Sequence, residues 1–547
     1  MATSTSGETT NARPVEAYDV VVIGAGFAGL YAVQRLARLG LKVLAFEKGG
    51  DVGGVWYWNR YPGARCDCES YYYSYSFSQE LQQEWDWSLR YSEQPEILSY
   101  LGHVADRFGL RDHIRFDAAV TRAHFDEATS RWRIEASDGS RVEAQFVVSA
   151  AGCLSQIQWP DIPGLHRFKG DLWHTAAWPH EGVDFSGKRV GVIGTGASGV
   201  QAIPRIARQA SHLTVFQRTA NWVLPAANRA TSPEFDAWVK TNYDAIREQC
   251  SNSAGAVPFD LPTRSALETS EAERRARYES LWATGGMRFF TAFTDLFTSL
   301  EANETAQAFV RERILATVHD PEVARRLIPF DHPIGVKRPP VDDDYYATFN
   351  RDNVTLVDIR EAPIQEITAD AVFTTEHHYE LDDLVLATGF DALTGALLAI
   401  DIRGRGGVSL RETWGEGPRS YLGLGVAGFP NLFTVTGPLS PSVLANMPTA
   451  VEQHVDWIAD CIVHMRERGL KTIEATEAAE GEWVAHSDEV VSGTLYPRAG
   501  SWYFGANVPG KPRKFGVYLG GFAAYRERCE AIAKDDYAGF RFGAPAN

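Results

Sequence analysis

Residues 18–47 read YDVVVIGAGFAGLYAVQRLARLGLKVLAFE, and this stretch decides the fold of the N-terminal part of the chain. An apolar run, VVVI, enters a glycine-rich turn, and a stretch with helical periodicity follows as far as Gly40. A second apolar run, VLAF, comes next. Unbroken apolar runs of this kind are typical of strands buried on both faces of a parallel sheet. The stretch therefore predicts a strand–helix–strand unit whose helix ends in a left-handed cap at Gly40.

The turn of this unit, GAGFAG, contains Gly24, Gly26 and Gly29. In such a loop the first glycine makes the tight turn, the second lets the backbone approach a pyrophosphate, and the third lets the helix pack closely on the strand. Glu47 ends the second apolar run, about 20 residues beyond the first glycine, where a carboxylate binds ribose hydroxyl groups. The unit therefore predicts a site for FAD or NAD.

A second strand–turn–helix unit begins at KRVGVIGTGASGVQ, and its glycines are Gly194, Gly196 and Gly199. At the position that corresponds to Glu47 the chain has Gln217, followed by Arg218 and Thr219. A guanidinium beside the ribose favours a 2′-phosphate through a charge-assisted contact, so the second loop predicts an NADPH site. Alternatively, Arg218 is only a surface charge that follows a strand.

The pattern of apolar and polar residues changes between these two units and again after the second one. Residues 114–150 alternate in short segments with a turn at Asp138-Gly139, which predicts an antiparallel meander that returns to a core strand. Residues 225–335 show no strand pattern and are interpreted as a helical insertion, in which Asp320 caps a helix that starts at Pro321. NVTLVDI and DDLVLATGFDA return to strand character, and residues 450–469 predict a helix.

Composition narrows the function classes. The 547 residues carry a formal net charge of −17, which disfavours nucleic acid and membrane surfaces as partners and makes single arginines at an anion site informative. The six cysteines form no C-x-x-C pair, which favours a reducing cytoplasm. The N-terminal residues predict a short disordered tail rather than a signal peptide, and no run of about 18 apolar residues predicts a membrane span.

After the first unit comes GGDVGGVWYWNRYPGARCDCES, residues 49–70, which is too aromatic for a solvent loop. Gly53 and Gly54 allow close approach of the backbone to a ligand, and Pro62-Gly63 predicts a turn. Arg65 and Asp67 lie two residues apart in this apolar setting, where a buried carboxylate needs a partner. Without further information, a structural ion pair that supports the loop is an equally good interpretation.

Two motifs give the chain a specific resemblance. FKGDLWHTAAWP fits the pattern F-x-G-x-x-x-H-x-x-x-W-[PD] at Phe168, Gly170, His174, Trp178 and Pro179. The pattern [AG]-G-x-W-x-x-x-x-[FY]-P-[GM]-x-x-x-D is fitted in full by Gly53, Gly54, Trp56, Tyr61, Pro62, Gly63 and Asp67, and an A-T-G strand end stands at residues 387–389. The chain thereby resembles the flavin-dependent Baeyer–Villiger monooxygenases over nearly its whole length, and most closely their phenylacetone and steroid monooxygenase branch.

The resemblance implies an α/β chain with two Rossmann-like dinucleotide-binding domains, for FAD and NADPH, and a helical insertion. The expected parts are a tail at 1–17, an FAD domain at 18–155 plus 390–547, an NADP domain at 164–224 plus 336–389, and the insertion at 225–335. Residues 168–179 would link the two dinucleotide domains, with His174 affecting how they couple. Alternatively, His174 is a satisfied packing histidine.

The implied reaction inserts one oxygen atom beside a ketone carbonyl to give an ester or lactone. NADPH reduces FAD, the reduced flavin captures O₂, and a flavin C4a-peroxide attacks the ketone. A fixed positive charge would keep the peroxide deprotonated and stabilise the developing alkoxide. On the resemblance, Arg338 is this catalytic cation, Asp67 orients it, and Lys337 reaches the 2′-phosphate of NADPH.

The resemblance also implies cofactor contacts and no metal. Arg65 would lie near the nicotinamide, Tyr73 near the flavin and Trp502 over NADP. Met447 would contact FAD or line the substrate pocket together with Cys153 and Leu154, or alternatively pack in the core. The complete set of cofactor-binding residues expected is Gly24, Gly26, Gly29, Glu47, Gly54, Val55, Trp56, Asp67, Tyr73, Met447, Arg65, Gly194, Thr195, Gly196, Ser198, Gly199, Arg218, Thr219, Lys337, Arg338 and Trp502.

Three other functions compete with this one. A disulfide reductase would share both dinucleotide sites, but Cys66 and Cys68 form a C-x-C pair, which is not the usual redox spacing. An N- or S-oxygenating flavin monooxygenase is the nearer alternative, and a non-enzymatic redox-sensing or binding protein is the third. The expected partners are a small ketone and O₂, with the chain a monomer or a dimer in the cytoplasm.

Overall fold

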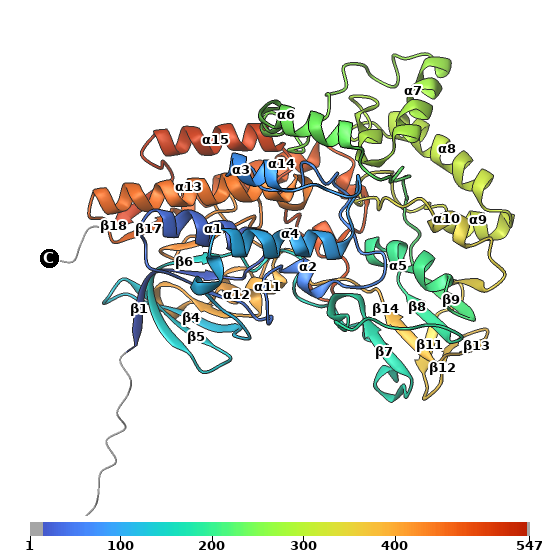
Figure 1. Cartoon of the computed structure of the whole chain (residues 1–547), viewed down its shortest axis with the longest axis horizontal. Coiled ribbons are helices and arrows are strands. Elements are labelled where there is room, and N and C mark those ends of the chain that lie inside the picture. The colour runs from blue at the N-terminus through green and yellow to red at the C-terminus, as the bar shows by residue number, and fades with distance from the viewer. Residues whose placement is uncertain (1–14, 544–547) are drawn as a thin grey trace, which may run out of the picture.

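The computed structural model of the chain describes residues 15–543, so residues 1–14 of the expected tail lie outside it. Its larger sheet has eight strands in the order β15-β4-β5-β6-β1-β2-β3, with β16 beside β6 (Figure 1). The first strand starts at Glu16, inside the segment 1–17 that the sequence analysis assigned to the tail. The strands are β1 (Glu16–Ile23), β2 (Val43–Phe46), β3 (Ile114–Arg115), β4 (Val120–Asp126), β5 (Arg131–Ala136), β6 (Arg141–Ser149), β15 (Asp401–Arg403) and β16 (Leu432–Thr434).

Strand β1 is buried on both faces, which explains its unbroken apolar run. Val20 and Val22 pack in one hydrophobic cluster with residues of three helices, α1 (Phe27–Arg38), α4 (Gln94–Arg107) and α13 (Met447–Glu467). Val21 and Ile23 point the other way, into a second cluster built around strands β4 to β6. The predicted meander is confirmed, because β4, β5 and β6 pair antiparallel and β6 then pairs parallel with β1. We call this sheet with its helices the first lobe.

A second, five-stranded sheet is parallel throughout, in the order β10-β9-β8-β14-β7. The helix α5 (Ala197–Ala207) packs on it, and a three-stranded antiparallel sheet, β11-β12-β13, lies beside it; together they form the second lobe (Figure 1). The five strands are β7 (Asp171–His174), β8 (Arg189–Ile193), β9 (His212–Gln217), β10 (Val354–Asp358) and β14 (Asp383–Leu386), and the antiparallel three are β11 (Ile364–Ile367), β12 (Ala371–Thr374) and β13 (His378–Glu380). This confirms the predicted α/β fold with two Rossmann-like sheets.

Part of the stretch 168–179 is a strand of the second sheet, which was not predicted from the sequence, and its role as a link between the two dinucleotide domains stays a prediction. Asp171–His174 form the edge strand β7, paired in parallel with β14. The imidazole of His174 is buried: its Nδ1 accepts a hydrogen bond from the Ala176 N–H at 3.0 Å, and its Nε2 lies 3.2 Å from the hydroxyl of Thr388. Burial lowers the pKa of His174 to about 4, so this ring is neutral and joins β7 to the loop after β14.

Residues 225–335 form helices and no strand, as predicted, with Asp320 capping the last helix through the N–H groups of Glu322 and Val323. These helices are α6 (Pro233–Ser251), α7 (Glu271–Thr284), α8 (Leu300–Thr317) and α9 (Pro321–Leu327). The C-terminal region adds α14 (Glu477–Ser492), α15 (Phe522–Lys534) and the pair β17 (Thr472–Ala475) with β18 (Phe540–Gly543) to the first lobe. Short helices are α2 (Val55–Trp58), α3 (Gln79–Glu84), α10 (Tyr345–Thr348), α11 (Gly395–Leu398) and α12 (Leu410–Thr413). No helix among residues 15–543 combines the length and apolarity that crossing a membrane requires.

A buried ion cluster fastens the insertion to the first lobe. Glu69 accepts from Arg90 at 3.0 Å and from Arg288 at 3.2 Å, and the side chains of Glu69 and Arg90 are 7% and 6% exposed. Arg288 belongs to the insertion, and Arg90 also donates to the carbonyls of Ala226 and Thr284. One carboxylate therefore holds two guanidinium groups from different parts of the chain.

We expect Glu69→Gln to lower the stability of the folded chain by about 3 kcal/mol, because the buried Arg90 and the partly exposed Arg288 would both lose their counter-charge. The rate of thermal inactivation of the FAD-loaded protein measures this loss. Glu248→Gln, a change at an exposed position of α6, is the matched control and should leave the rate unchanged. Equal rates for both variants would contradict the role given to Glu69.

Candidate active site between the two lobes

In the first glycine loop, two glycines lie so close to neighbouring backbone oxygens that a side chain would collide with them. Gly24 has φ +104°, and a Cβ on it would stand 2.5 Å from the Ala150 carbonyl oxygen; on Gly29 it would stand 1.8 Å from the Gly24 oxygen. The carboxylate of Glu47 is buried and accepts from the Ala25 and Gly49 N–H groups at 2.8 and 2.7 Å. Burial raises the pKa of Glu47, and the two backbone donors oppose that rise. The loop thus presents backbone and a fixed carboxylate at the start of α1.

The second loop repeats this geometry in the second lobe. Gly194 has φ +111° and its Cβ would stand 2.4 Å from the Ala387 oxygen, while a Cβ on Gly199 would stand 2.2 Å from the Gly194 oxygen. At Gly196, by contrast, no protein atom lies within 4 Å of the position of a Cβ. Gly196 is the glycine at which this type of loop admits a pyrophosphate, and the open space there would fit a dinucleotide. The Thr195 hydroxyl donates a hydrogen bond to the Thr219 carbonyl at 2.8 Å, which connects the loop to the segment after β9.

Arg338 and Asp67 form a two-pronged ion pair between segments 271 residues apart. Arg338 Nε donates to Asp67 Oδ2 at 2.5 Å and Nη2 to Oδ1 at 2.7 Å, while Nη1 donates to the Val443 carbonyl at 2.7 Å. Burial alone would lower the pKa of Arg338, but the charge and hydrogen bonds of Asp67 outweigh it and raise that pKa above its ordinary value. The guanidinium is therefore permanently charged and fixed in direction.

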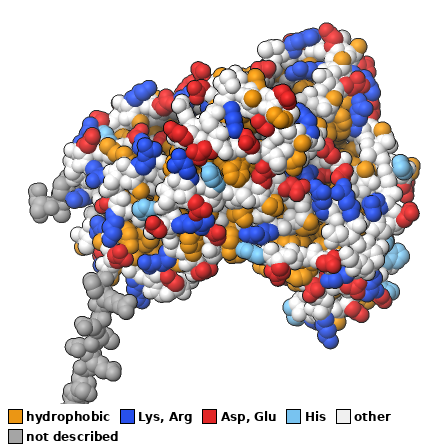
Figure 2. Space-filling view, viewed as in Figure 1, with side chains coloured by type: hydrophobic (Ala, Val, Ile, Leu, Met, Phe, Trp, Pro, Cys, Tyr) orange, Lys and Arg blue, Asp and Glu red, His pale blue; other side chains and the backbone are white. Residues whose placement is uncertain are grey.

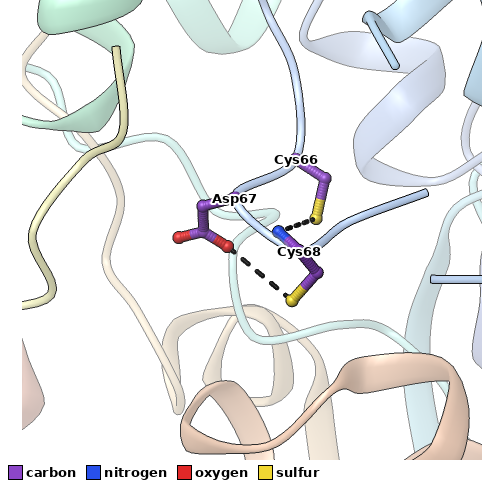
Figure 3. A group of neighbouring side chains, drawn as sticks. All are labelled: Cys66, Asp67 and Cys68. Atoms are coloured by element: carbon purple, nitrogen blue, oxygen red, sulfur yellow. Dashed lines mark hydrogen bonds between the residues drawn. The ribbon is translucent and has the colours of Figure 1, made fainter. Parts of the chain in front are cut away.

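Asp67 lies between two cysteines, as Figure 3 shows. The Cys68 N–H donates to the sulfur of Cys66 at 3.4 Å, and the Cys68 thiol lies 3.9 Å from Asp67 Oδ1. Burial raises the pKa of the Cys66 thiol, and the neighbouring Cys68 and Asp67 add to the effect. All six cysteines are free. A carboxylate committed to Arg338 and a Cys66 thiol with a raised pKa make this trio a poor metal site.

Arg65 and Asp67 do not pair with each other, contrary to the structural interpretation left open by the sequence. Arg65 instead bonds Asp342, which precedes α10 in the second lobe, and both side chains are buried. Its Nε is buried with no hydrogen-bond partner among the described residues, which fits a ligand acceptor at this place. Gln201 of α5 accepts from the Tyr61 hydroxyl at 2.8 Å and donates to the Arg65 carbonyl at 3.1 Å. No local sequence pattern marks Gln201 or Asp342, because Tyr61 and Arg65, to which they bond, lie far away along the chain.

Arg218 and Lys337, the residues predicted to bind the 2′-phosphate, are charged neighbours beyond the carboxyl end of β9. Arg218 follows β9, is exposed, and forms no ion pair within residues 15–543. Lys337 Nζ lies 3.7 Å from Asp331 Oδ2. Burial lowers the pKa of Lys337, and of its charged neighbours Asp331 raises it while Arg218 and Arg360 lower it. The positively charged side chains of Arg218 and Arg360 are therefore near the partly buried Lys337.

The other expected residues fall into two groups. Around Arg338 and Asp67, Trp56 Nε1 donates to the hydroxyl of Tyr73 at 3.2 Å, and Gly54 packs against Gly26. Met447, the first residue of α13, and Trp502 border an apolar cluster that contains Cys153, Val443 and Tyr503. Val55 begins α2, while Ser198 lies in the first turn of α5. Met447 and Trp502 thus border the same cluster as Val443, whose carbonyl accepts from Arg338.

Comparison with known proteins gives a consistent result. Residues 17–252 match the family described as flavin-binding monooxygenase-like. A Baeyer-Villiger monooxygenase of Pseudooceanicola batsensis is 44% identical over 538 residues, which cover 97% of each chain. A phenazine N-monooxygenase of Lysobacter antibioticus is 44% identical over 527 residues, 96% of each chain. The solved structure of an oxidised steroid monooxygenase bound to NADP is 54% identical, with a TM-score of 0.93 over 96% of this chain and 99% of that one.

Thiol labelling tests the electrostatics beside Asp67. Since the pKa of the Cys66 thiol is raised, its thiolate is scarce, and iodoacetamide should alkylate Cys66 more slowly in the folded protein than in the unfolded chain at the same pH. Mass spectrometry of the peptide that contains both cysteines measures the rate. The guanidine-unfolded chain serves as the control and should label at the ordinary rate. Fast labelling of Cys66 in the folded protein at neutral pH would contradict this picture.

Proposed function

The chain belongs to the flavin-dependent Baeyer–Villiger monooxygenases, and we propose that its catalytic group is the Arg338 guanidinium held by Asp67. The enzyme uses NADPH and O₂ to insert one oxygen atom next to the carbonyl of a ketone, which gives an ester or lactone. FAD is its second cofactor. The observation that carries the assignment is the ion pair itself, since a charged group fixed in direction at a half-buried site can stabilise an anion without reorganising.

Bound FAD, once reduced with NADPH, supplies the activated oxygen. The protein must then hold negative charge on oxygen, orient the reactants and exclude water. Arg338 supports the first task because it stays protonated at every physiological pH. Asp67 and the Val443 carbonyl engage one N–H of each of its three nitrogens. The second N–H group of Nη1 and that of Nη2 have no partner among these contacts. We assign these two N–H groups to the developing oxyanion.

The apolar cluster beside Arg338 supports the exclusion of water and the binding of a ketone. It contains buried Val443, Leu393 and Tyr503, and burial raises the pKa of the Cys153 thiol to about 11, so this cysteine adds no charge. Met447 and Trp502 border the cluster, and we assign them to its ligand-facing side. A ketone with an apolar body suits such a lining.

We extend the proposal to the two nucleotide sites and to the domain boundaries expected from the sequence. Glu47 would accept from the ribose of FAD, Arg65 would donate to the nicotinamide end of NADPH, and Arg218, Thr219 and Lys337 would hold its 2′-phosphate. The unpartnered Nε of Arg65 and the absence of an ion pair to Arg218 within residues 15–543 support these roles. We further propose a cytoplasmic monomer or dimer, because the six free cysteines suit a reducing compartment.

Arg338→Ala should leave the reduction of FAD by NADPH largely intact and lower ester formation about 10²- to 10³-fold, the usual cost of losing one oxyanion donor. Stopped-flow absorbance follows flavin reduction and reoxidation, and gas chromatography measures the ester. Arg498→Ala removes an exposed cation near the same cluster and is the matched control. Normal ester yield from Arg338→Ala would disprove the assignment.

N-oxygenation is the second candidate function, and the equally similar phenazine N-monooxygenase is the observation that favours it. A ketone and a tertiary amine, offered at equal concentration, distinguish the two reactions. We expect NADPH consumption to match ester formation from the ketone and to exceed N-oxide formation from the amine. The reverse ratio would replace the proposed substrate class.

A further inference from the structure

The carboxyl ends of β9 and β10 form one edge of the second sheet. The two strands are parallel neighbours, with Gln217 opposite Asp358, and the Ile359 N–H donates to the Gln217 carbonyl at 2.9 Å. Arg218 follows β9 directly, and Arg360 follows β10 by two residues. Ligands of open α/β sheets bind beyond the carboxyl ends of the strands. Two arginines therefore follow neighbouring strands at the edge where a nucleotide would bind, and both are charged neighbours of Lys337.

A loop from the insertion, residues 328–337, lies over this edge. The Gln217 side chain donates to the Arg326 carbonyl at 2.7 Å, which fixes the end of α9 above the end of β9. Phe330 is 75% exposed, and the Arg360 guanidinium stacks over its ring at 4.5 Å. Arg360 is also held by Asp358 at 2.8 Å. Lys337 closes the loop and adds a third cation to the edge.

Asp331 introduces an anion among these cations. Its Oδ2 lies 3.7 Å from Lys337 Nζ, and its Oδ1 lies 2.6 Å from His332 Nδ1. The side chain of His332 is fully buried. The backbone carbonyl of His332 accepts a hydrogen bond from the Trp222 indole N–H at 3.2 Å. The hydrogen bond from His332, followed by the charge of Lys337, lowers the pKa of Asp331 to about 2. Asp331 is therefore negatively charged at neutral pH. Its hydrogen bond to His332 fixes the direction of the carboxylate.

We infer that Asp331 is a specificity-determining residue, whose fixed carboxylate beside Lys337 opposes the 2′-phosphate of NADPH and so limits the preference for NADPH over NADH. The inference rests on the proposed placement of the 2′-phosphate at Arg218 and Lys337. A dianionic phosphate that contacts Lys337 stands within a few ångströms of Asp331. Arg360, which Asp358 already neutralises in part, offsets the repulsion incompletely. At partly exposed sites such a repulsion corresponds to about a tenfold change in affinity.

Titration of the FAD-loaded full chain with 2′,5′-ADP and with 5′-AMP tests the inference, because the two ligands differ only by the 2′-phosphate. Isothermal calorimetry at low salt gives both affinities without turnover. Asp331→Asn should bind 2′,5′-ADP about tenfold more tightly and 5′-AMP unchanged. Asp331→Glu should stay close to the wild type. Glu376→Gln removes an exposed carboxylate elsewhere in the second lobe and is the matched control, with no change expected.

Lys337→Met separates this inference from the proposal beneath it. If Lys337→Met binds 2′,5′-ADP as well as the wild type does, the placement of the 2′-phosphate is wrong and the inference falls with it. If Lys337→Met binds 2′,5′-ADP more weakly than the wild type, the placement of the 2′-phosphate stands. Only the role of Asp331 is then overturned if Asp331→Asn binds 2′,5′-ADP no more tightly than the wild type, or binds both ligands more weakly. An equal melting temperature and FAD content for Asp331→Asn shows that the comparison is between folded proteins.

Discussion

The pair of Arg338 with Asp67 is the interaction on which the proposed chemistry depends. It joins a loop of the first lobe to the segment where the insertion returns to the second lobe, so neither lobe contains the cation and its orienting carboxylate together. A half-buried guanidinium without a counter-charge would be costly, and so would the carboxylate alone. Each therefore fixes the other. The position of the charge is decided by how the two lobes meet.

A partner carboxylate also holds a cation of the first lobe, Arg65, and a cation of the second lobe, Arg360. Arg65 has Asp342, and Arg360 has Asp358. A chain with a net charge of −17 must concentrate positive charge locally to bind two anionic cofactors, and Figure 2 shows both signs interspersed over the face in view. A partner carboxylate holds each cation in place, but it also weakens the attraction for an anion. Arg218 is the exception, with no ion pair in the described chain, and it stands where the strongest anion is assigned.

Two cores keep these contacts in register. Alternate residues of β1 face opposite hydrophobic clusters, and the glycine loop after it is fixed by the Ala150 and Gly24 carbonyls, which admit no side chain. The insertion is held to the first lobe by Glu69 and to the end of β9 by Gln217. Because the loop 328–337 leaves this insertion just before Arg338, the packing of its helices also sets where Lys337 and Arg338 arrive.

Local sequence alone determined both strand–glycine–helix units, the meander and the capped helix at Asp320, because each follows from periodicity and turn chemistry over a few residues. A family motif contains Asp67, and the family resemblance implied Arg338 as well. Only the tertiary structure decided that Arg65 pairs with Asp342 and not with Asp67, that residues 171–174 form a strand, and that Asp331 stands beside Lys337. Some of these contacts join segments that lie far apart along the chain, where no local sequence pattern can predict the pairing. Others depend on side-chain directions, which are set by burial and by the packing of the two lobes against each other.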